Sequence, residues 1–345
     1  MAFMRTFATE ISAVTGRSDV FERVLYSLPR GVQMAFAYGS GVFQQSGGNM
    51  SKNMIDFIVV VDNPHKWHKE NLAMNSKHYS SLKWLGPQRI RNIQQNYGAG
   101  IYYNTLVPFE QRLIKYGVIS TDTLMSDLNN WDSLYVSGRL HKPVKMVKKP
   151  SSADVIRSLH TNLRSSLHTS LLMLPETFTD LDLFTAITSL SYSGDFRMTF
   201  GEEKGKIMKI VTPNLEHFQR LYHPLINETQ HLTYNEKIGK YVNFHNEATR
   251  FYHLNLLPRC VIEGLFIAKQ GKDPYIYPDN EEFIRKMALD GNCKEYVAKS
   301  IAGIVKKSSK RQSLKGIWTA GLRKSVKYSF SKVKKMFKGM IASKK

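Results

Sequence analysis

The chain has 345 residues, of which 42% are hydrophobic and 22% are charged, and this length and composition suit two domains with buried cores. Its two cysteines exclude a disulfide framework, and no apolar run approaches the ~18 residues of a membrane-spanning helix. The net charge of +21 is concentrated at one end, because 14 Lys or Arg and no acidic residue follow position 305. That end therefore favours an anionic partner.

The first predicted element is a short helix over residues 21–28, where apolar side chains recur at helical spacing before Pro29. The residues before it lack the apolar core of a secretory signal. Residues 32–38 then form an apolar run typical of a buried strand. This strand ends in Gly39, Ser40 and Gly41, where the backbone can turn sharply and present several N–H groups to one anion.

A second strand is expected over residues 55–61, after a polar loop, and it carries Asp56 near its start. The two strands would bring the glycine-serine turn and this carboxylate together. Mg²⁺ held by Asp56 could then bridge triphosphate oxygens while the turn binds the phosphates, which is the arrangement that nucleotidyl transfer requires. An ordinary turn and a strand-end Asp remain the alternative for these residues taken alone.

The spacing of the turn and the acidic residue resembles that of the polymerase-beta-like nucleotidyltransferase superfamily. That superfamily usually has a second carboxylate two residues earlier, where this chain has Met54. Asp62 lies on the same strand face as Asp56 but about 20 Å away along an extended strand. The second metal ligand is therefore missing from its expected place, and Asp56 is the metal ligand that these two strands provide.

Further strands are expected over residues 97–109, 112–119 and 134–147, and the last of these carries Arg139, His141 and Lys142. A helix beginning at Thr121 separates the last two. Strands with few helices between them indicate an α+β protein with a mixed sheet.

Three histidines, His65, His68 and His78, follow the second strand, with no further Cys or His at a ligand spacing nearby. They are expected to form hydrogen bonds and not a zinc site.

The second half of the chain begins at the KKPSS stretch, residues 148–152, and is mainly helical by its periodicity. One helix should bury leucines that recur every fourth residue from Val155 to Leu171, and another should cover residues 180–190. Asp195 and Arg197 follow on a tight turn after Gly194 and are interpreted as a polar pair facing a cleft. A surface ion pair is the alternative.

The basic end of the chain has the pattern of an interfacial amphipathic helix. Its apolar residues, which include Trp318, Leu322, Phe330 and Phe337, recur every three or four positions, and only basic charges fill the other faces. Such a helix binds an anionic membrane surface. Nucleic-acid binding is less favoured because it needs no apolar stripe, and packing on the protein body is the third interpretation.

Six ordered motifs resemble those of the mitochondrial phosphatidate cytidylyltransferases, the translocator assembly and maintenance family of CDP-diacylglycerol synthases. They are YGSGVF (38–43), MIDFI (54–58), HYS (78–80), GIYYNT (100–105), LYVSGRLHKPV (134–144) and SYSGDFRM (191–198).

The resemblance implies a nucleotidyltransferase domain (residues 1–148), a mainly helical, winged-helix-like domain (149–300) and a membrane-binding tail (301–345). The implied reaction makes CDP-diacylglycerol and pyrophosphate from CTP and phosphatidate with Mg²⁺, a step toward cardiolipin. The implied location is peripheral, on the matrix side of the mitochondrial inner membrane, without nucleic acid as a partner.

The candidate site residues are then assigned as follows. Ser40 and Asp56 are catalytic, and Asp56 also binds the metal. Substrate phosphates are expected at Gly39, Ser40, Gly41, Arg139, Lys142 and Arg197, with Asp195 orienting Arg197 or binding metal. An RNA nucleotidyltransferase and a non-catalytic membrane adaptor are the two rival interpretations.

Overall fold

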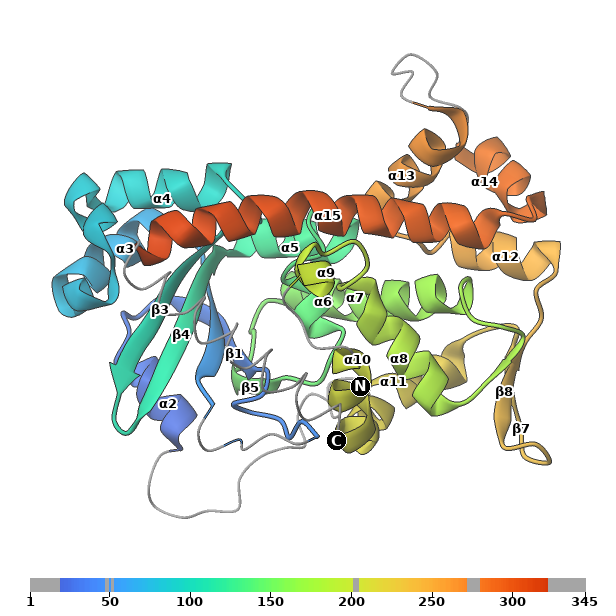
Figure 1. Ribbon diagram of the computed structural model, residues 1–345, viewed down its shortest axis with the longest axis horizontal. Coiled ribbons are helices and arrows are strands. Elements are labelled where there is room, and N and C mark those ends of the chain that lie inside the picture. The colour runs from blue at the N-terminus through green and yellow to red at the C-terminus, as the bar shows by residue number, and fades with distance from the viewer. Residues whose placement is uncertain (1–18, 47–49, 51–52, 201–204, 272–279, 322–345) are drawn as a thin grey trace.

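The computed structural model of the protein describes residues 19–46, 50, 53–200, 205–271 and 280–321. Figure 1 shows a mixed sheet at one end, a helical region with a small second sheet at the other, and one long helix, α15, lying across both. The expected α+β class is confirmed.

The larger sheet has five strands in the order β3-β4-β2-β1-β5, and only the pairing of β2 with β4 is parallel. Its strands are β1 (Val32–Tyr38), β2 (Ile55–Val61), β3 (Ile101–Phe109), β4 (Arg112–Ser120) and β5 (Lys145–Lys148). β1 and β2 match their predicted limits, β3 begins four residues later than predicted and β4 ends one residue later. The parallel pair needs a crossover, and α3 (Pro64–Asn75) and α4 (Gly86–Asn96) lie in it together with β3.

Each face of this sheet is covered by helices, because its strands alternate two sets of apolar side chains. One face packs on α2 (Val20–Tyr26) and α3, with Phe57 and Trp67 in its core. The other packs on α5 (Thr121–Asn130), α6 (Ser137–Leu140) and α7 (Ala153–Leu171), with Ile58 and Leu159 in its core. On this second face the strands also carry polar side chains beyond the apolar core. These polar residues form the candidate site.

The strand expected over residues 134–147 is wrong for most of its length. Only Lys145–Lys148 is extended, and Ser137–Leu140 forms the short helix α6. The reason is Asp127 of α5, which is 3% exposed and whose carboxylate accepts bonds from the N–H groups of Ser133, Leu134, Val136 and Ser137. Gathering four N–H groups around one carboxylate curls the chain and prevents strand pairing there.

The second half is mainly helical, as expected. Its helices after α7 are α8 (Asp180–Leu190), α9 (Arg197–Phe200), α10 (Lys206–Val211), α11 (Leu215–Glu228), α12 (Glu247–Leu254), α13 (Arg259–Gln270) and α14 (Asn280–Leu289). A small antiparallel sheet, in the order β6-β8-β7, contains β6 (Thr177–Phe178), β7 (Leu232–Asn235) and β8 (Lys240–Asn243). The predicted apolar stripe of α7 is buried at all five positions and joins the core of the sheet to the core of the helical region.

Helix α15 (Cys293–Ala320) is 28 residues long and runs through the position where the tail was expected to begin. Ile301 and Val305 are buried in the helical region, whereas Gln312 and Lys315 are buried against β3 and α4. Residues 301–320 therefore belong to a helix that packs on the protein body along one side, and the membrane role expected of the tail remains a prediction. The domain limits at 148 and 300 remain predictions.

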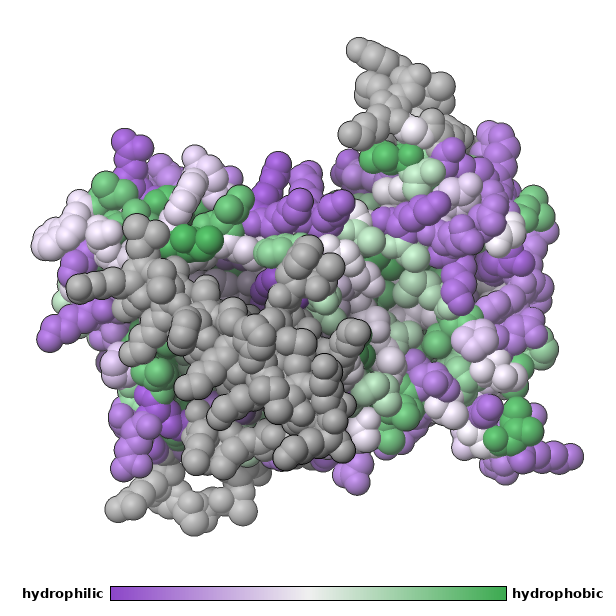
Figure 2. Space-filling model, viewed as in Figure 1, coloured by the Kyte–Doolittle hydropathy of each residue, from purple (hydrophilic) through white to green (hydrophobic). Residues whose placement is uncertain are grey.

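No helix within the described ranges is long and apolar enough to cross a membrane. Figure 2 shows hydrophobic side chains gathered where the end of α15 meets α4. The exposed large hydrophobic residues of these two segments and of the turn after α4 are Tyr97, Leu314, Ile317 and Trp318.

Candidate active site

The glycine-serine turn lies directly against the start of β2, as predicted. Tyr38, the last residue of β1, pairs with Asp56 across the two strands. Gly39 has φ +81°, and a Cβ there would lie 3.6 Å from Asp56 Oδ2. A Cβ on Gly41 would lie 2.4 Å from the carbonyl oxygen of Met54, so only glycine fits. Turn and carboxylate are therefore neighbours, with Ser40 between the two glycines.

The loop that follows the turn is held by an arginine that sequence reasoning did not single out. Arg112, at the start of β4, donates to the carbonyl oxygens of Met50 (2.9 Å) and Asn53 (2.7 Å) and, at 3.3 Å, of Gly41. Asn53 in turn donates its side-chain amide to the carbonyl of Ser40 at 3.1 Å. These bonds fix the turn and the loop that follows it.

A second missed residue, Lys115, stands beside Asp56. The two residues are partners in the parallel pairing of β2 with β4, and Lys115 Nζ lies 3.3 Å from Asp56 Oδ1. The ammonium also lies 4.3 Å from the ring centroid of Tyr103. That ring lies over Gly117, where a Cβ would come within 2.5 Å of it. Lys115 therefore places a positive charge at the edge of the predicted metal and phosphate site.

Arg139 of α6 lies in a cluster of tyrosines. Its guanidinium carbon is 3.8 Å from the ring centroid of Tyr135 and 5.4 Å from that of Tyr38, and it donates to the Tyr135 carbonyl. Tyr38 and Tyr103 hydroxyls are 3.4 Å apart. Burial raises the pKa of Tyr135, but the positive charges of Arg139, Lys115 and Arg197 outweigh burial and lower it below its usual value. The electrostatic environment is thus strongly cationic, as an anionic substrate requires.

Lys142 connects α6 to the second half of the chain. Its Nζ donates to the Gly138 carbonyl and, at 2.9 Å, to the hydroxyl of Ser191 at the end of α8. Burial, together with the nearby charges of Arg139 and Lys206, lowers the pKa of Lys142 to about 7. The side chain therefore lies in a cationic enclosure where an anion would stabilise its charged form.

Asp195 and Arg197 form a close ion pair on the turn after Gly194, as the sequence indicated. Asp195 is 4% exposed, and Arg197 donates Nε to both of its carboxylate oxygens at 3.0 Å. Burial raises the pKa of Asp195, but the hydrogen bonds and charge of Arg197 hold it below its usual range. Both carboxylate oxygens are engaged by Arg197, which favours the orienting role of Asp195 over metal ligation.

The residues around Asp56 suit a metal held mainly by its substrate. Asp56 Oδ1 is buried, and although Lys115 Nζ lies 3.3 Å away it accepts no well-aligned hydrogen bond among the described residues. The described ranges also contain no group of three His, Cys, Asp or Glu side chains that would enclose an ion. Mg²⁺ commonly keeps several waters and binds one or two carboxylates together with substrate phosphates. Asp56 and the adjacent turn fit that pattern.

The residues predicted to bind a membrane are only partly covered by the structure. Trp318 is 62% exposed near the end of α15, and its ring lies 6.5 Å from that of Tyr97. Leu322, Phe330 and Phe337 lie outside the described residues.

Comparison with known proteins adds an independent finding. The model of the family described as "Phosphatidate cytidylyltransferase, mitochondrial" matches residues 21–335. A protein of that name from Danio rerio is 45% identical over 334 residues, covering 95% of this chain and 98% of the relative. Proteins of the same name from Xenopus laevis and Bos taurus are 42% and 44% identical, each over 96% of this chain and 98% of the relative.

Proposed function

The chain belongs to the mitochondrial phosphatidate cytidylyltransferase family, and from this premise we propose that it transfers the cytidylyl group of CTP to phosphatidate. The products are CDP-diacylglycerol, which leads toward cardiolipin, and pyrophosphate. The observation that carries the assignment of the site is the juxtaposition of the Gly39–Gly41 turn, Asp56 and Lys115 across three adjoining strands.

In the proposed mechanism the turn at Gly39, Ser40 and Gly41 binds phosphates of CTP through its N–H groups. Asp56 would hold Mg²⁺, which, when bound, supplies neutralisation of the triphosphate charge. Lys115, 3.3 Å from Asp56, is positioned to contact a phosphate oxygen at the reacting centre. Phosphatidate already carries an anionic phosphate at neutral pH, so the residues need only align and neutralise the reactants and no strong general base is required.

The lipid phosphate is assigned to the cationic cluster of Arg139, Lys142 and Arg197. These side chains come from α6 and from the turn after α8, so the site lies between the sheet and the helical region. Asp195 orients Arg197 through the hydrogen bonds described above. Arg139 is stacked on Tyr135, and Lys142 is partly buried. Neither forms a salt bridge with a carboxylate among the described residues, so both positive charges suit phosphate recognition.

The proposal includes the architecture and location that the family resemblance implies. The five-stranded domain would have the polymerase-beta-like nucleotidyltransferase fold, and the helical domain would be winged-helix-like. The protein would bind peripherally to an anionic membrane, on the matrix side of the mitochondrial inner membrane. The exposed hydrophobic residues around Trp318 stand next to the start of the basic tail and support a membrane-facing end of α15.

The direct test uses purified full-length protein, Mg²⁺ and CTP labelled in its cytidine ring. Label should enter a chloroform-soluble product only when phosphatidate is present. Label appearing in added RNA and not in lipid would overturn the proposal in favour of an RNA nucleotidyltransferase. Failure of the protein to bind CTP with Mg²⁺ would leave only the adaptor interpretation.

A further inference from the structure

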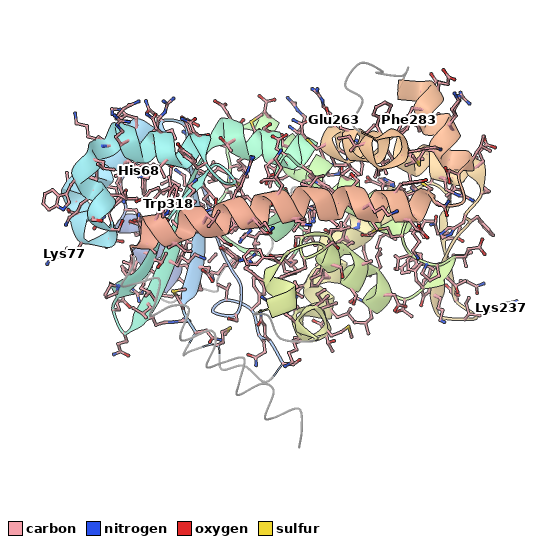
Figure 3. All side chains as sticks on the ribbon, turned by 45° about the horizontal axis from the view of Figure 1, so that its top comes forward. His68, Lys77, Lys237, Glu263, Phe283 and Trp318 are labelled. Carbon is pink, nitrogen blue, oxygen red and sulfur yellow. The ribbon has the colours of Figure 1, made fainter. Side chains whose placement is uncertain are left out.

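A cavity of about 170 Å³ lies in the helical region, at the first turn of α15. Its polar and cationic wall comes from β8, the loop after it, α12 and α15, and contains Asn243, His245, Thr249, Arg250, His253 and Lys294. The rest of the wall is formed by Leu171, Leu172, Gly291 and Cys293. None of the candidate active-site residues lines it. Figure 3 shows Trp318 at one end of α15 and Phe283, on α14, near the opposite end, which is the end that borders the cavity. A 28-residue helix is about 42 Å long, so the cavity is remote from the residues at the other end of α15.

Arg250 gives the cavity a fixed positive charge. Its Nε and Nη2 donate to the His245 carbonyl at 3.2 and 2.9 Å, and its Nη1 donates to the Asp290 carbonyl at 3.2 Å. The carboxylate of Asp290 is engaged elsewhere, by Lys269 at 2.7 Å and by the Asn292 amide at 2.8 Å. Across the described ranges no carboxylate forms a salt bridge with Arg250. Three carbonyl bonds thus orient the guanidinium without neutralising it.

Two buried polar groups of the cavity wall lack a partner. Thr249 is 1% exposed, and its hydroxyl forms no hydrogen bond among the described residues. Within the same described ranges, the Nε2 atom of His245 is also buried without a hydrogen-bond partner. Buried donors left unpaired are costly, and an orphaned group of this kind commonly marks the place of a bound ion or water.

The first turn of α15 adds a third feature. Asn292 caps this helix without a side-chain hydrogen bond, and Lys294 lies in its first turn and lines the cavity. The positive end of a long helix attracts anions, and oxyanions bind at such ends through N–H groups. Of the acidic residues near the wall, Asp290 is paired with Lys269, and Glu176 and Glu295, the latter in the first turn of α15, are exposed.

We propose that this cavity is a phosphate-binding site separate from the nucleotidyl-transfer site. The Thr249 hydroxyl and the Nε2–H of His245 donate to phosphate oxygens, while Arg250 and Lys294 supply the compensating charge. The chemistry recognised is a phosphate dianion, whether free in solution or as an exposed monoester headgroup of a lipid. The proposal does not depend on the proposed reaction, because none of these residues takes part in it.

The test is calorimetric titration of the full chain with inorganic phosphate at constant ionic strength, with the transfer site saturated by Mg²⁺ and a non-hydrolysable CTP analogue. We expect a saturable component of phosphate binding that Thr249→Val weakens at least tenfold and Lys294→Gln weakens several-fold. Any phosphate bound by the cationic cluster of Arg139, Lys142 and Arg197 should be unaffected by these two substitutions. Thr249→Val removes only an unbonded hydroxyl, so its melting temperature should match that of the parent chain. Lys299→Gln, which removes an exposed charge from the same helix one and a half turns away, is the matched control and should leave binding unchanged.

Absence of saturable phosphate binding, or equal binding by the parent chain and Thr249→Val, would overturn the proposal. A second arm repeats the titration with phosphatidate vesicles and with phosphatidylcholine vesicles. If the affinity for inorganic phosphate falls with phosphatidate vesicles but not with phosphatidylcholine vesicles, the site binds a lipid headgroup. Unchanged affinity in both assigns it to free phosphate.

Discussion

Asp56 and Lys115 show how the site is built from single residues. The carboxylate and the ammonium are partly exposed, at 24% and 17% of their side-chain area, and lie 3.3 Å apart in the first halves of the paired strands β2 and β4. A partly exposed ion pair contributes little to stability because water screens it. Stability alone therefore does not explain why both charged groups lie here. The substrate that they would contact explains it better.

We expect Lys115→Met to lower kcat/KM about 10- to 100-fold, since a hydrogen bond to a charged group contributes roughly 1.5–3 kcal/mol. Lys115→Arg, which keeps the charge but changes its geometry, should recover part of the loss. Initial rates at varied CTP and phosphatidate, with melting temperatures as the control for folding, make the measurement. Wild-type kcat/KM in a folded Lys115→Met protein would remove this residue from the site.

The residue scale also shows how much of the site the sequence contains. The turn at Gly39–Gly41 and Asp56 could be predicted because they follow consecutive apolar runs, and their neighbours in sequence are their neighbours in space. Lys115 could not, because its place beside Asp56 depends on β4 pairing in parallel with β2 after a long crossover. Nothing local to residues 112–120 encodes that register.

At the scale of elements, the turn that carries Asp195 and Arg197 is positioned by α15. Gly194 has φ +78°, and a Cβ there would lie 2.4 Å from the carbonyl oxygen of Ala302. Gly31 has a similar φ of +81°, but nothing lies within 4 Å of a Cβ placed there. A substitution at Gly31 therefore measures backbone strain alone, without the close contact.

Gly31→Ala should reduce the free energy of unfolding by about 1–2 kcal/mol, the usual cost of a left-handed conformation with a Cβ. Gly194→Ala should cost about 1–3 kcal/mol more because the backbone of α15 must also move. Denaturant unfolding measures both variants, and activity should fall only for Gly194→Ala. Equal destabilisation of the two proteins would mean that the contact with α15 is unimportant.

Helix α15 also contains a buried lysine whose pKa makes stability depend on pH. Lys315 is 2% exposed and donates to the carbonyls of Gln94 (2.8 Å) and Tyr97 (2.7 Å), and burial lowers its pKa to about 7. Lysine in the unfolded chain titrates near 10.4, so between pH 7 and 10 the unfolded state binds more protons. Folding stability from this group therefore rises with pH in that window and is lowest below pH 7.

We expect the unfolding free energy of the parent chain, minus that of Lys315→Met, to rise with pH between 7 and 9.5. The slope should approach about 1.4 kcal/mol per pH unit. Lys307→Met, at an exposed position of the same helix, should show no such slope relative to the parent. Parallel pH profiles for the parent and Lys315→Met would contradict the lowered pKa.

Helices and strands could be predicted where the spacing of apolar residues determines them. They could not be predicted where a contact from a distant side chain determines them. The stripe of α7 and the limits of α8 follow from spacing and are confirmed. The strand expected over residues 134–147 failed because Asp127 collects four N–H groups from the segment after α5. The sequence gives no sign that an aspartate within a polar stretch will be buried and will accept hydrogen bonds from several backbone N–H groups.

At the scale of the whole molecule, α15 joins the helical region to the sheet and ends where the basic tail begins. Gln312 accepts a hydrogen bond from the Ala99 amide at 2.9 Å, so the last turns of α15 are tied to the start of β3. Because Trp318 lies on this fixed helix, the segment after Gly321 starts from a defined point next to the five-stranded sheet and its helices. The membrane role of the tail itself remains a prediction from its amphipathic sequence.

A chain ending at Gly321 should keep its melting temperature and bind CTP normally but fail to sediment with vesicles containing phosphatidate or cardiolipin. Replacing Leu322, Phe330 and Phe337 by Ser should weaken sedimentation nearly as much while keeping every charge, because apolar insertion and surface charge act together. Raising salt should weaken the intact chain only in part. Full vesicle binding by the Ser variant would show that the apolar stripe is not the anchor.

We propose that Asp56 and the adjoining turn carry out cytidylyl transfer to phosphatidate. The most direct measurement uses CTP labelled at either the α- or the γ-phosphate, phosphatidate vesicles and Mg²⁺, with the parent chain and Asp56→Asn compared. The account predicts α-label in lipid, γ-label in pyrophosphate, equal yields of both, and about a thousandfold slower transfer by a folded Asp56→Asn protein. Label from the γ-phosphate in lipid, or transfer by Asp56→Asn at the parent rate, would contradict it.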